Sequence, residues 1–474
     1  MLPVDFPVKG ISCNSRKTGS DFVFVAIRGV KADGNKFIEE AVSNGARGVV
    51  LKSEGKGIKI KEKNKVVFIE VEDDRKALAQ LACAFYGNPS AKMKVIGVTG
   101  TNGKTTITYL IESILKECGK VAGVIGTINY RFRDKIISSQ NTTPGPLELQ
   151  LMLDEMRKAG AAYAVMEVSS HALAQGRTDR INFSSAIFTN LTHDHLDYHK
   201  DMEDYFLVKS KLFRQLCSQA LAIINNDDPY GLRIKQLSKG KVITYGIDNA
   251  CDVRALDLNM DISSSEFLLQ TKSGREVFKV KLIGRHNVYN VLAAFSWAQA
   301  EGLDLDKVKR ALENFTFVPG RLERVGSGKE IFSVFLDYAH TEDALKNVLS
   351  ALRQIQHERI IVVFGCGGER DKTKRPKMGN VVSQLADYVI ITNDNSRSEE
   401  PEDIIKDIKS GIKKDNFCVI PERMEAIKKS LSLAKSGDIV LVAGKGHEDY
   451  QILKDKTLHF DDREAIKQCL QSMS

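Results

Sequence analysis

Short apolar runs alternate with amphipathic stretches along the whole chain. Short apolar runs bounded by turn residues are typical of strands, and apolar residues recurring every three or four positions are typical of helices. In the first part of the chain, strands are expected at Phe22–Ile27, Val49–Leu51 and Val66–Ile69, and a helix at Arg75–Tyr86. Asn88-Pro89-Ser90 then interrupts the pattern and marks a linker.

The alternation continues to the end of the chain. Five central runs predict strands at Val121–Ile125, Ala164–Val168, Ser185–Thr189, Ala220–Ile224 and Lys241–Tyr245. Helical patterns lie between most of them, which favours a doubly wound, mostly parallel sheet. After Val318-Pro319-Gly320, strands are expected at Val334–Asp337, Ile360–Phe364, Tyr388–Thr392, Phe417–Ile420 and Ile439–Ala443. We therefore expect three α/β domains, at residues 1–88, 89–318 and 319–474, the last Rossmann-like and without its own phosphate loop.

A glycine-rich turn opens the central segment. Residues 97–106 read Gly-Val-Thr-Gly-Thr-Asn-Gly-Lys-Thr-Thr, between an apolar pair and the amphipathic stretch Ile107–Leu115. Glycines let the backbone approach phosphates, and the N–H groups of the turn and the helix start point at the anion. Lys104 can neutralise phosphate charge, and the Thr105 hydroxyl can bind Mg²⁺. Val98 stands where this motif usually has its first glycine, so a chance turn is the alternative to a nucleoside triphosphate site.

Two further motifs follow central strands and carry metal-binding residue types. Glu167 ends one strand at the sheet edge where α/β folds bind ligands, and it could hold Mg²⁺ on the nucleotide. An ordinary surface strand end is the alternative. The next stretch has three histidines and two aspartates in seven positions: His193, Asp194, His195, Asp197 and His199.

Histidine suits Zn²⁺ or Mn²⁺ better than Mg²⁺, so the second stretch alone also fits a zinc hydrolase. The phosphate loop favours metal–nucleotide chemistry instead, with His193 as a candidate ligand of a second metal. We expect at least one of the three histidines to be a helix cap or a packing contact.

Polar loops follow three predicted strands of the last segment. They are Gly365–Asp371, Asn393–Pro401 and Ala443–Glu448. Each alone is equally consistent with a binding loop and with an ordinary turn followed by a helix cap. Because the carboxyl ends of parallel strands share one sheet edge, together they predict a second substrate pocket.

Composition narrows the partners and the compartment. The net charge is +8, but lysines and arginines are dispersed without a basic, aromatic-studded stripe, so nucleic acid is not expected as a partner. The densest run, Lys52–Lys65 with six lysines, is interpreted as a solvated edge. The eight cysteines are scattered and form no C-x-x-C pair, and several, such as Cys83, Cys366 and Cys418, have apolar neighbours in the sequence. We therefore interpret them as reduced core residues. With no signal peptide and no apolar run of ~20 residues, we expect a cytoplasmic protein without membrane insertion.

These motifs, in this order, resemble the Mur ligase family, the ATP-dependent amino-acid ligases of cell-wall precursor synthesis. The resemblance is carried by Gly100–Thr106, Glu167–His171, His193–Asp197, Gly284–Asn290, Pro319–Arg321 and Asp337–Thr341. Ser15-Arg16 with Asp21–Ala26, Asn141–Pro144 and Gln175–Arg177 resemble the family branch that binds a UDP-muramoyl dipeptide. That N-terminal part argues against folylpolyglutamate synthase, a relative that shares the ATP core. His286 stands where the family often has phenylalanine.

The resemblance implies roles for particular residues. Catalysis falls to Lys104, Glu167, His193 and Lys209, and the segment Tyr205–Lys209 matches one whose lysine is carbamylated. The Mg²⁺ ligands are Thr105, Glu167, His193 and carbamylated Lys209. ATP contacts are Gly100, Thr101, Asn102, Gly103, Lys104, Thr105, Thr106, Asn287, Arg321 and Asp337. The UDP substrate contacts Ser15, Asn141, Thr142, Thr143, Ser169, Gln175 and Arg177, and the amino acid contacts Arg370, Asp394, Asn395, Ser396, Arg397, Gly444 and Glu448.

The implied reaction joins meso-2,6-diaminopimelate to UDP-N-acetylmuramoyl-L-alanyl-D-glutamate through an acyl phosphate, in a monomer. Family members that add this amino acid read Asp-Asn-Pro-Arg where this chain reads Asp394-Asn395-Ser396-Arg397. Arginine can bind the extra carboxylate that distinguishes diaminopimelate from lysine. An L-lysine-adding ligase and a nucleotide-gated switch protein are the alternatives. The three polar loops and the threonine–proline segment favour a ligase over a switch, which needs no second small-molecule pocket.

Overall fold

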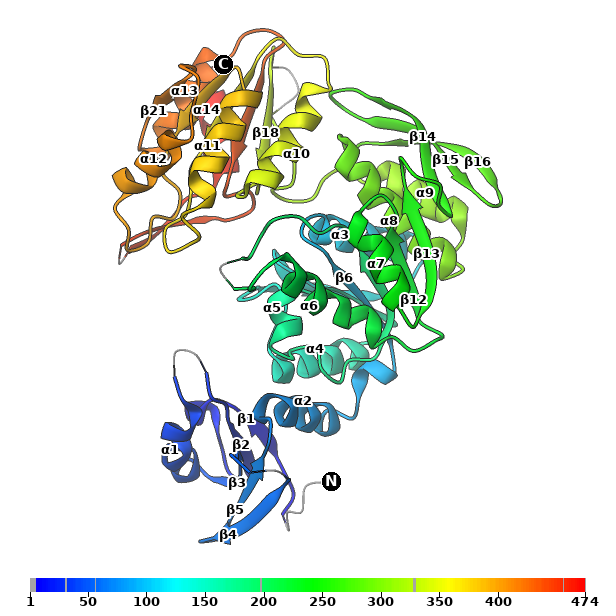
Figure 1. Ribbon diagram of the computed structural model, residues 1–474, viewed down its shortest axis with the longest axis vertical. Coiled ribbons are helices and arrows are strands. Elements are labelled where there is room, and N and C mark those ends of the chain that lie inside the picture. Colours follow the sequence, from blue (N-terminus) through cyan, green and yellow to red (C-terminus); the bar gives the residue numbers. More distant parts are fainter. Residues whose placement is uncertain are drawn as a thin grey trace.

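Three large β-sheets of the described residues follow one another along the molecule (Figure 1). The computed structural model describes residues 6–29, 32–55, 57–196, 198–326, 330–454 and 456–473. The N-terminal sheet lies at one end, the sheet that carries the phosphate loop in the middle, and the C-terminal sheet at the other end. The predicted α/β class with a central doubly wound sheet is confirmed, while the predicted domain boundaries stay predictions.

The N-terminal sheet has the order β1-β2-β3-β5-β4, and only β4 runs antiparallel to its neighbour. Its strands are β1 (Gly10–Ser12), β2 (Phe22–Ala26), β3 (Ala46–Lys52), β4 (Lys59–Lys63) and β5 (Val66–Val71). Alternate residues of β2 face opposite sides, so Val23 and Val25 pack with α2 (Asp74–Phe85), and Phe24 packs with α1 (Ile38–Ser43). Every residue of β4 is exposed, which confirms a solvated lysine-rich edge.

The central sheet has eleven strands in the order β16-β15-β14-β13-β12-β11-β6-β10-β7-β8-β9. The strands from β14 to β7 pair in parallel, and each edge ends in an antiparallel pair. The parallel strands are β6 (Lys94–Thr99), β7 (Ala122–Ile125), β10 (Tyr163–Glu167), β11 (Phe183–Phe188), β12 (Leu221–Asn225), β13 (Lys241–Gly246) and β14 (Val253–Met260). The edge strands are β8 (Asn129–Phe132), β9 (Lys135–Ser138), β15 (Ser265–Thr271) and β16 (Gly274–Val280).

Helices cover both faces of the central sheet. One face packs against α3 (Lys104–Glu117), α8 (Arg285–Ala300) and α9 (Leu305–Asn314). The other packs against α4 (Pro146–Lys158), α5 (Ser170–Ala174), α6 (Met202–Arg214) and α7 (Pro229–Leu237). Burial on both faces explains why most of the parallel strands are continuous apolar runs, from which β6, β7, β10, β11, β12 and β13 could be predicted. The parallel strand β14 escapes prediction because buried and partly exposed residues alternate along it.

The C-terminal sheet has the order β17-β18-β22-β19-β20-β21, parallel apart from β17. Its strands are β17 (Glu323–Val325), β18 (Ser333–Asp337), β19 (Ile360–Phe364), β20 (Tyr388–Ile391), β21 (Phe417–Val419) and β22 (Ile439–Ala443). One face packs against α10 (Glu342–Arg353), α11 (Lys374–Leu385) and α12 (Pro401–Ser410), and the other against α13 (Arg423–Leu433) and α14 (Asp462–Met473). A separate hairpin, β23 (Tyr450–Leu453) with β24 (Lys456–His459), follows β22.

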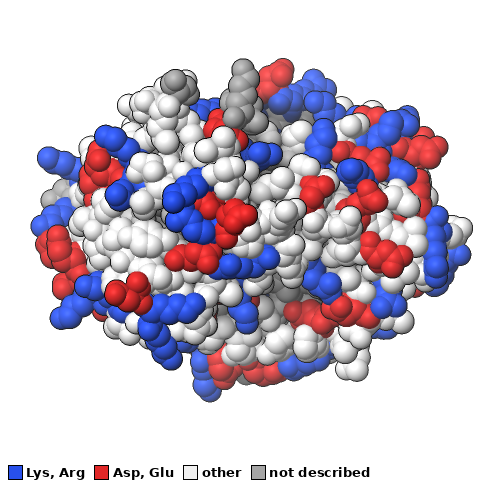
Figure 2. All heavy atoms as spheres, turned by 90° about the horizontal axis from the view of Figure 1, so that it is seen from above, with Lys and Arg blue, Asp and Glu red and all other residues white. Residues whose placement is uncertain are grey.

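The surface and the cysteines agree with a reduced protein of mixed charge. Figure 2 shows lysine and arginine side chains interspersed with aspartate and glutamate on the face in view. All eight cysteines are free; Cys366 is buried as expected, whereas Cys83 and Cys418 are only partly buried. Among the described helices, none is long and apolar enough to cross a bilayer.

Candidate active site

The phosphate loop lies between β6 and α3, as the glycine pattern predicts. Gly100 and Gly103 have φ angles of +147° and +89°, a region that favours glycine. Both are also packed too closely for a side chain: a Cβ would lie 1.8 Å from Thr189 Oγ1 at Gly100 and 2.4 Å from Asn290 Oδ1 at Gly103. No side chain caps the start of α3, so its first N–H groups remain available to an anion.

Two lysine side chains meet at the base of this loop. Lys104 Nζ donates to the carbonyls of Gly100 at 3.0 Å and Thr101 at 2.8 Å, and Lys209 Nζ donates to the same Gly100 carbonyl at 2.8 Å. Burial, and then the adjacent Lys104 charge, hold the pKa of Lys209 well below its usual value. Burial lowers the pKa of Lys104 too, against the opposing effect of Glu167. A buried amine with a depressed pKa is an effective nucleophile, which suits carbamylation of Lys209.

Oxygen ligands for a hard cation lie near the loop. The Glu167 carboxylate accepts hydrogen bonds from Thr127 N at 2.8 Å and Thr127 Oγ1 at 3.0 Å, which fix its orientation. The Thr105 hydroxyl accepts from Arg321 Nη2 at 3.3 Å. No group of three or more His, Cys, Asp or Glu side chains forms a metal cage among the described residues. This donor set fits Mg²⁺, which binds through one or two protein oxygens together with substrate phosphates and water.

The histidines of the stretch from His193 to His199 differ in their surroundings, as expected. His193 lines the cleft. The ring of His199 instead stacks on Tyr205 with centroids 4.9 Å apart and shares a 2.9 Å hydrogen bond with Ser170 Oγ. His199 therefore is the packing contact, and Asp197 lies outside the described residues.

The residues assigned to the UDP substrate form a connected group, with one exception. Arg177 Nη1 donates to the Thr143 carbonyl at 2.9 Å, and its Nη2 donates to Gln175 Oε1 at 2.8 Å. Ser169 N donates to Thr143 Oγ1 at 3.1 Å. Ser15 lies in the N-terminal sheet region, where its hydroxyl donates to Glu40 at 2.6 Å.

Charged side chains of both signs gather at the C-terminal sheet edge. Asn395 Nδ2 donates to Glu448 Oε2 at 2.8 Å, and Arg397 Nη1 donates to the Gly368 carbonyl at 2.7 Å. Burial would raise the pKa of the Asp394 carboxyl, but the Arg423 and Lys445 charges hold it below its usual value. An anionic and a cationic group side by side match a ligand that carries both an ammonium and a carboxylate.

A buried ion pair supports the loops of this pocket. Arg423 and Asp462 have fully buried side chains and join through two hydrogen bonds of 2.7 Å. Arg423 also donates to the carbonyls of Asn393 at 3.2 Å and Ala443 at 3.1 Å. One guanidinium thus holds the residues that directly precede Asp394 and Gly444.

A single cleft of about 1210 Å³ connects these groups. It is lined by most of the predicted residues: Thr101–Thr106, Asn141, Thr142, Glu167, Ser169, Arg177, His193, Asn287, Arg321, Asp337, Arg370, Asp394, Asn395, Arg397, Gly444 and Glu448. Gly100, Thr143, Gln175, Lys209 and Ser396 lie outside this lining, and so does Ser15. Gly100, Thr143, Gln175 and Ser396 adjoin lining residues in sequence or through the contacts above, and Lys209 reaches the lining through Gly100. The described hydrogen bonds of Ser15 that involve a side chain are with Glu40 and Asn44, outside the lining.

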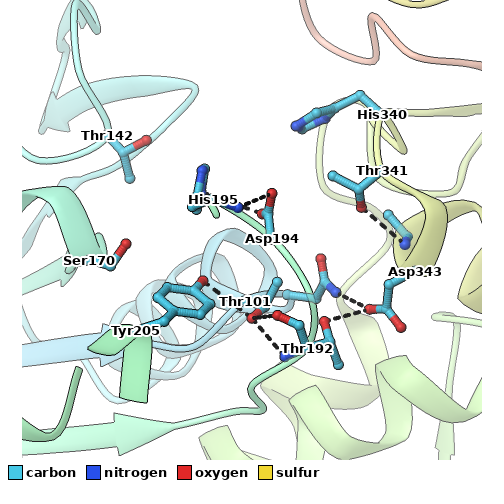
Figure 3. A network of polar contacts seen from close by, with 12 residues as sticks. Thr101, Thr142, Ser170, Thr192, Asp194, His195, Tyr205, His340, Thr341 and Asp343 are labelled. Atoms are coloured by element: carbon cyan, nitrogen blue, oxygen red, sulfur yellow. Dashed lines mark hydrogen bonds and ion pairs between the residues drawn. The ribbon is translucent and has the colours of Figure 1, made fainter. Parts of the chain in front are cut away.

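Polar side chains also join the two walls of the cleft (Figure 3). Asp343 on α10 accepts from Asn102 Nδ2 at 2.7 Å and from Thr192 Oγ1 at 2.9 Å. Thr101 Oγ1 lies 3.3 Å from Tyr205 OH in the same network. Asp343 is a site residue that the sequence did not reveal, because an acid in the first turn of a helix ordinarily only stabilises that helix.

Three family descriptions match successive parts of the chain. "Mur ligase family, catalytic domain" matches residues 7–86, "Mur ligase middle domain" residues 98–298, and "Mur ligase, glutamate ligase domain" residues 320–446. A UDP-N-acetylmuramoyl-L-alanyl-D-glutamate--2,6-diaminopimelate ligase of Clostridium tetani is 44% identical over 472 residues, 99% of this chain and 96% of that protein. The chain belongs to the Mur ligase family.

Other Mur ligases agree with this result. The ligase of the same name from Aquifex aeolicus is 45% identical over 464 residues, 98% of this chain and 94% of that protein. A solved structure of a ligase of that name is 32% identical and has a TM-score of 0.71. The match covers 98% of this chain and 95% of that structure's chain. The family resemblance and the fold class inferred from the sequence are both confirmed.

Proposed function

We propose that this Mur ligase uses ATP to join meso-2,6-diaminopimelate to the D-glutamate side chain of UDP-N-acetylmuramoyl-L-alanyl-D-glutamate. The observation that carries the proposal is the single cleft. It brings together the phosphate loop, the residues assigned to the UDP substrate (Asn141, Thr142, Ser169 and Arg177) and a pocket with charges of both signs. The names of the relatives support the same pair of substrates. Eight free cysteines support a cytoplasmic location, and we propose that the protein acts as a monomer.

The first step is phosphoryl transfer. A carboxylate oxygen of D-glutamate attacks the γ-phosphorus of ATP, ADP leaves, and an acyl phosphate forms. Such transfer depends mainly on positioning and charge neutralisation. Lys104 would exchange its contacts with the Gly100 and Thr101 carbonyls for the phosphates, while Arg321 and the start of α3 supply further positive potential. Thr105, Glu167 and His193 would hold Mg²⁺, which when bound neutralises phosphate charge.

The second step forms the amide bond. The amine nitrogen of the amino acid attacks the acyl carbon and loses a proton, and the tetrahedral intermediate expels inorganic phosphate. Asp394 and Glu448 would receive the distal ammonium of the amino acid, and Arg397 its distal carboxylate. In the described contacts Arg397 uses Nη1 on backbone carbonyls, which leaves Nη2 and Nε for a ligand.

Carbamylation of Lys209 would complete the metal side of the site. A neutral lysine amine adds to CO₂, forms an N–C bond and releases a proton, which leaves an anionic carbamate. At Gly100 the two lysines share one carbonyl, so a carbamate on Lys209 would replace repulsion of Lys104 by attraction.

An omission assay tests the proposed function. We expect ADP release by the full-length protein only when ATP, the UDP-muramoyl dipeptide and meso-diaminopimelate are all present. The product, identified by mass spectrometry, should be the UDP-muramoyl tripeptide. ADP release that needs neither the dipeptide nor the amino acid would support the nucleotide-gated switch instead.

A further inference from the structure

Asp343 is placed where the ATP side of the cleft meets the C-terminal sheet. It lies in the first turn of α10, whose apolar side, including Leu345, Leu349 and Leu352, packs on that sheet. One oxygen, Oδ2, accepts three hydrogen bonds: from Asn102 Nδ2 at 2.7 Å, Thr192 Oγ1 at 2.9 Å and Asn347 Nδ2 at 3.1 Å. Asn347 lies on α10 itself, so this single oxygen joins two segments of the central part of the chain, at Asn102 and Thr192, to α10.

Two of the donors to Asp343, Asn102 and Thr192, lie in or beside the phosphate loop. Asn102 is part of the phosphate loop, and its backbone N–H donates to Asn190 Oδ1 at 2.9 Å. Thr192 directly precedes His193, and its N–H donates to Thr101 Oγ1 at 3.0 Å. A ligand that reorders the phosphate loop therefore changes the positions of both donors to Asp343.

On the other side, α10 transmits position to the amino-acid pocket. The apolar residues of α10 share a core with Phe364 at the end of β19 and with Ala443 at the end of β22. These two strands lead directly into the loops of Arg370 and of Glu448. Because packed cores resist continuous deformation, displacement of α10 displaces these strand ends with it.

We propose that Asp343 is the positioning residue that couples ATP binding to amino-acid binding. This inference rests on the proposed function. A nucleotide that orders the phosphate loop also orders α10 through Asp343, so the amino acid then binds a pocket whose ordering cost has already been met. Coupling of this kind is reciprocal, and each ligand tightens the other by the same factor.

Calorimetric titration of the full-length protein tests the coupling. The dissociation constant of meso-diaminopimelate is measured in the presence of the UDP-muramoyl dipeptide, with and without β,γ-methylene-ATP and Mg²⁺. We expect the nucleotide to tighten binding at least about fivefold in the wild type. In Asp343→Ala this ratio should fall to near one.

Three further variants separate the hydrogen bonds from the charge. Asp343→Asn keeps an oxygen acceptor, so the nucleotide should still tighten meso-diaminopimelate binding, but by less than in the wild type. Thr192→Val removes one donor to Asp343 and should have the same partial effect. Glu342→Ala removes an equal charge from the same helical turn but leaves all three donors to Asp343, so its ratio should equal that of the wild type. A purely structural role would lower thermal stability without changing the ratio.

Several results would overturn the inference. They are a wild-type ratio near one or below it, an unchanged ratio in folded Asp343→Ala, and an equal loss in Glu342→Ala. If Asp343→Ala does not fold, Asp343→Asn and Thr192→Val decide the matter by the same criterion. A wild type that fails the omission assay overturns the proposed function, whereas a wild type that ligates while Asp343→Ala keeps its ratio overturns this inference alone.

Discussion

The buried Arg423–Asp462 pair provides a prediction that separates stability from substrate binding. Both side chains are 0% exposed, so Asp462→Asn leaves the guanidinium charge in the core without its hydrogen-bonded counter-ion. Breaking a buried pair in this way costs about 3–5 kcal/mol of unfolding free energy. By comparison, Glu203→Gln breaks the exposed Arg233–Glu203 pair, 44% and 53% exposed, leaves Arg233 over the Phe206 ring and should cost far less, because solvent screens exposed ion pairs.

The same change should affect one substrate more than the others. Arg423 holds the carbonyls of Asn393 and Ala443, which precede the two loops of the amino-acid pocket. Misplacement of these loops should raise KM for meso-diaminopimelate about tenfold or more, while KM for ATP changes little. Thermal unfolding and steady-state kinetics with each substrate varied in turn measure both effects.

A double variant makes the reasoning refutable. Arg423→Met with Asp462→Leu replaces the pair by apolar side chains of similar volume, which typically restores stability. It restores neither backbone contact, so KM for the amino acid should stay high in a protein of near wild-type stability. A double variant with wild-type KM would show that the pair contributes to stability alone.

Three further predictions concern the ATP side of the cleft. Lys104→Ala should abolish ligation and leave calorimetric binding of the UDP-muramoyl dipeptide nearly intact, because its amine faces phosphate-loop carbonyls; loss of that binding in a folded variant would contradict the separation of sites. Lys209→Ala should be inactive and partly rescued by a small carboxylic acid, whereas full activity without rescue would exclude a carbamate. Burial raises the pKa of Asp337 from 3.8 to about 6, so the folded state binds the carboxyl proton more tightly than the unfolded state does. The stability that this proton contributes is fully present below pH 3.8 and is lost as the pH rises through 6. Asp337→Asn should therefore gain up to ~3 kcal/mol relative to the wild type between pH 4 and 7 in urea unfolding, and a constant difference would refute this.

Much of the parallel core could be predicted from the sequence because strands buried on both faces are short and continuously apolar. Ile360–Phe364 and Ile439–Ala443 coincide with β19 and β22. The antiparallel edge strands escaped prediction: β9 is wholly exposed, and β16 has only two buried residues, so neither shows a clear apolar run. Exposed edges carry little of the hydrophobic pattern on which such predictions depend.

The candidate site divides in the same way. Local motifs such as the phosphate loop predict their own geometry, since glycine and helix start are adjacent in the chain. Asp343 and Arg423 could not be found in this way. Each acts on residues far away in sequence, Asn102 and Ala443 among them, and only the folded chain brings them together.

The choice of amino acid tests the central proposal most directly. The measurement compares kcat/KM for meso-diaminopimelate and L-lysine in the wild type and in Arg397→Ala, with ATP and the UDP-muramoyl dipeptide saturating. Loss of one charge-assisted contact costs at least ~2 kcal/mol, so the wild type should prefer meso-diaminopimelate more than about tenfold, and Arg397→Ala should lose that preference. Comparable values for the two amino acids, or unchanged selectivity in Arg397→Ala, would contradict the proposed function of this cleft.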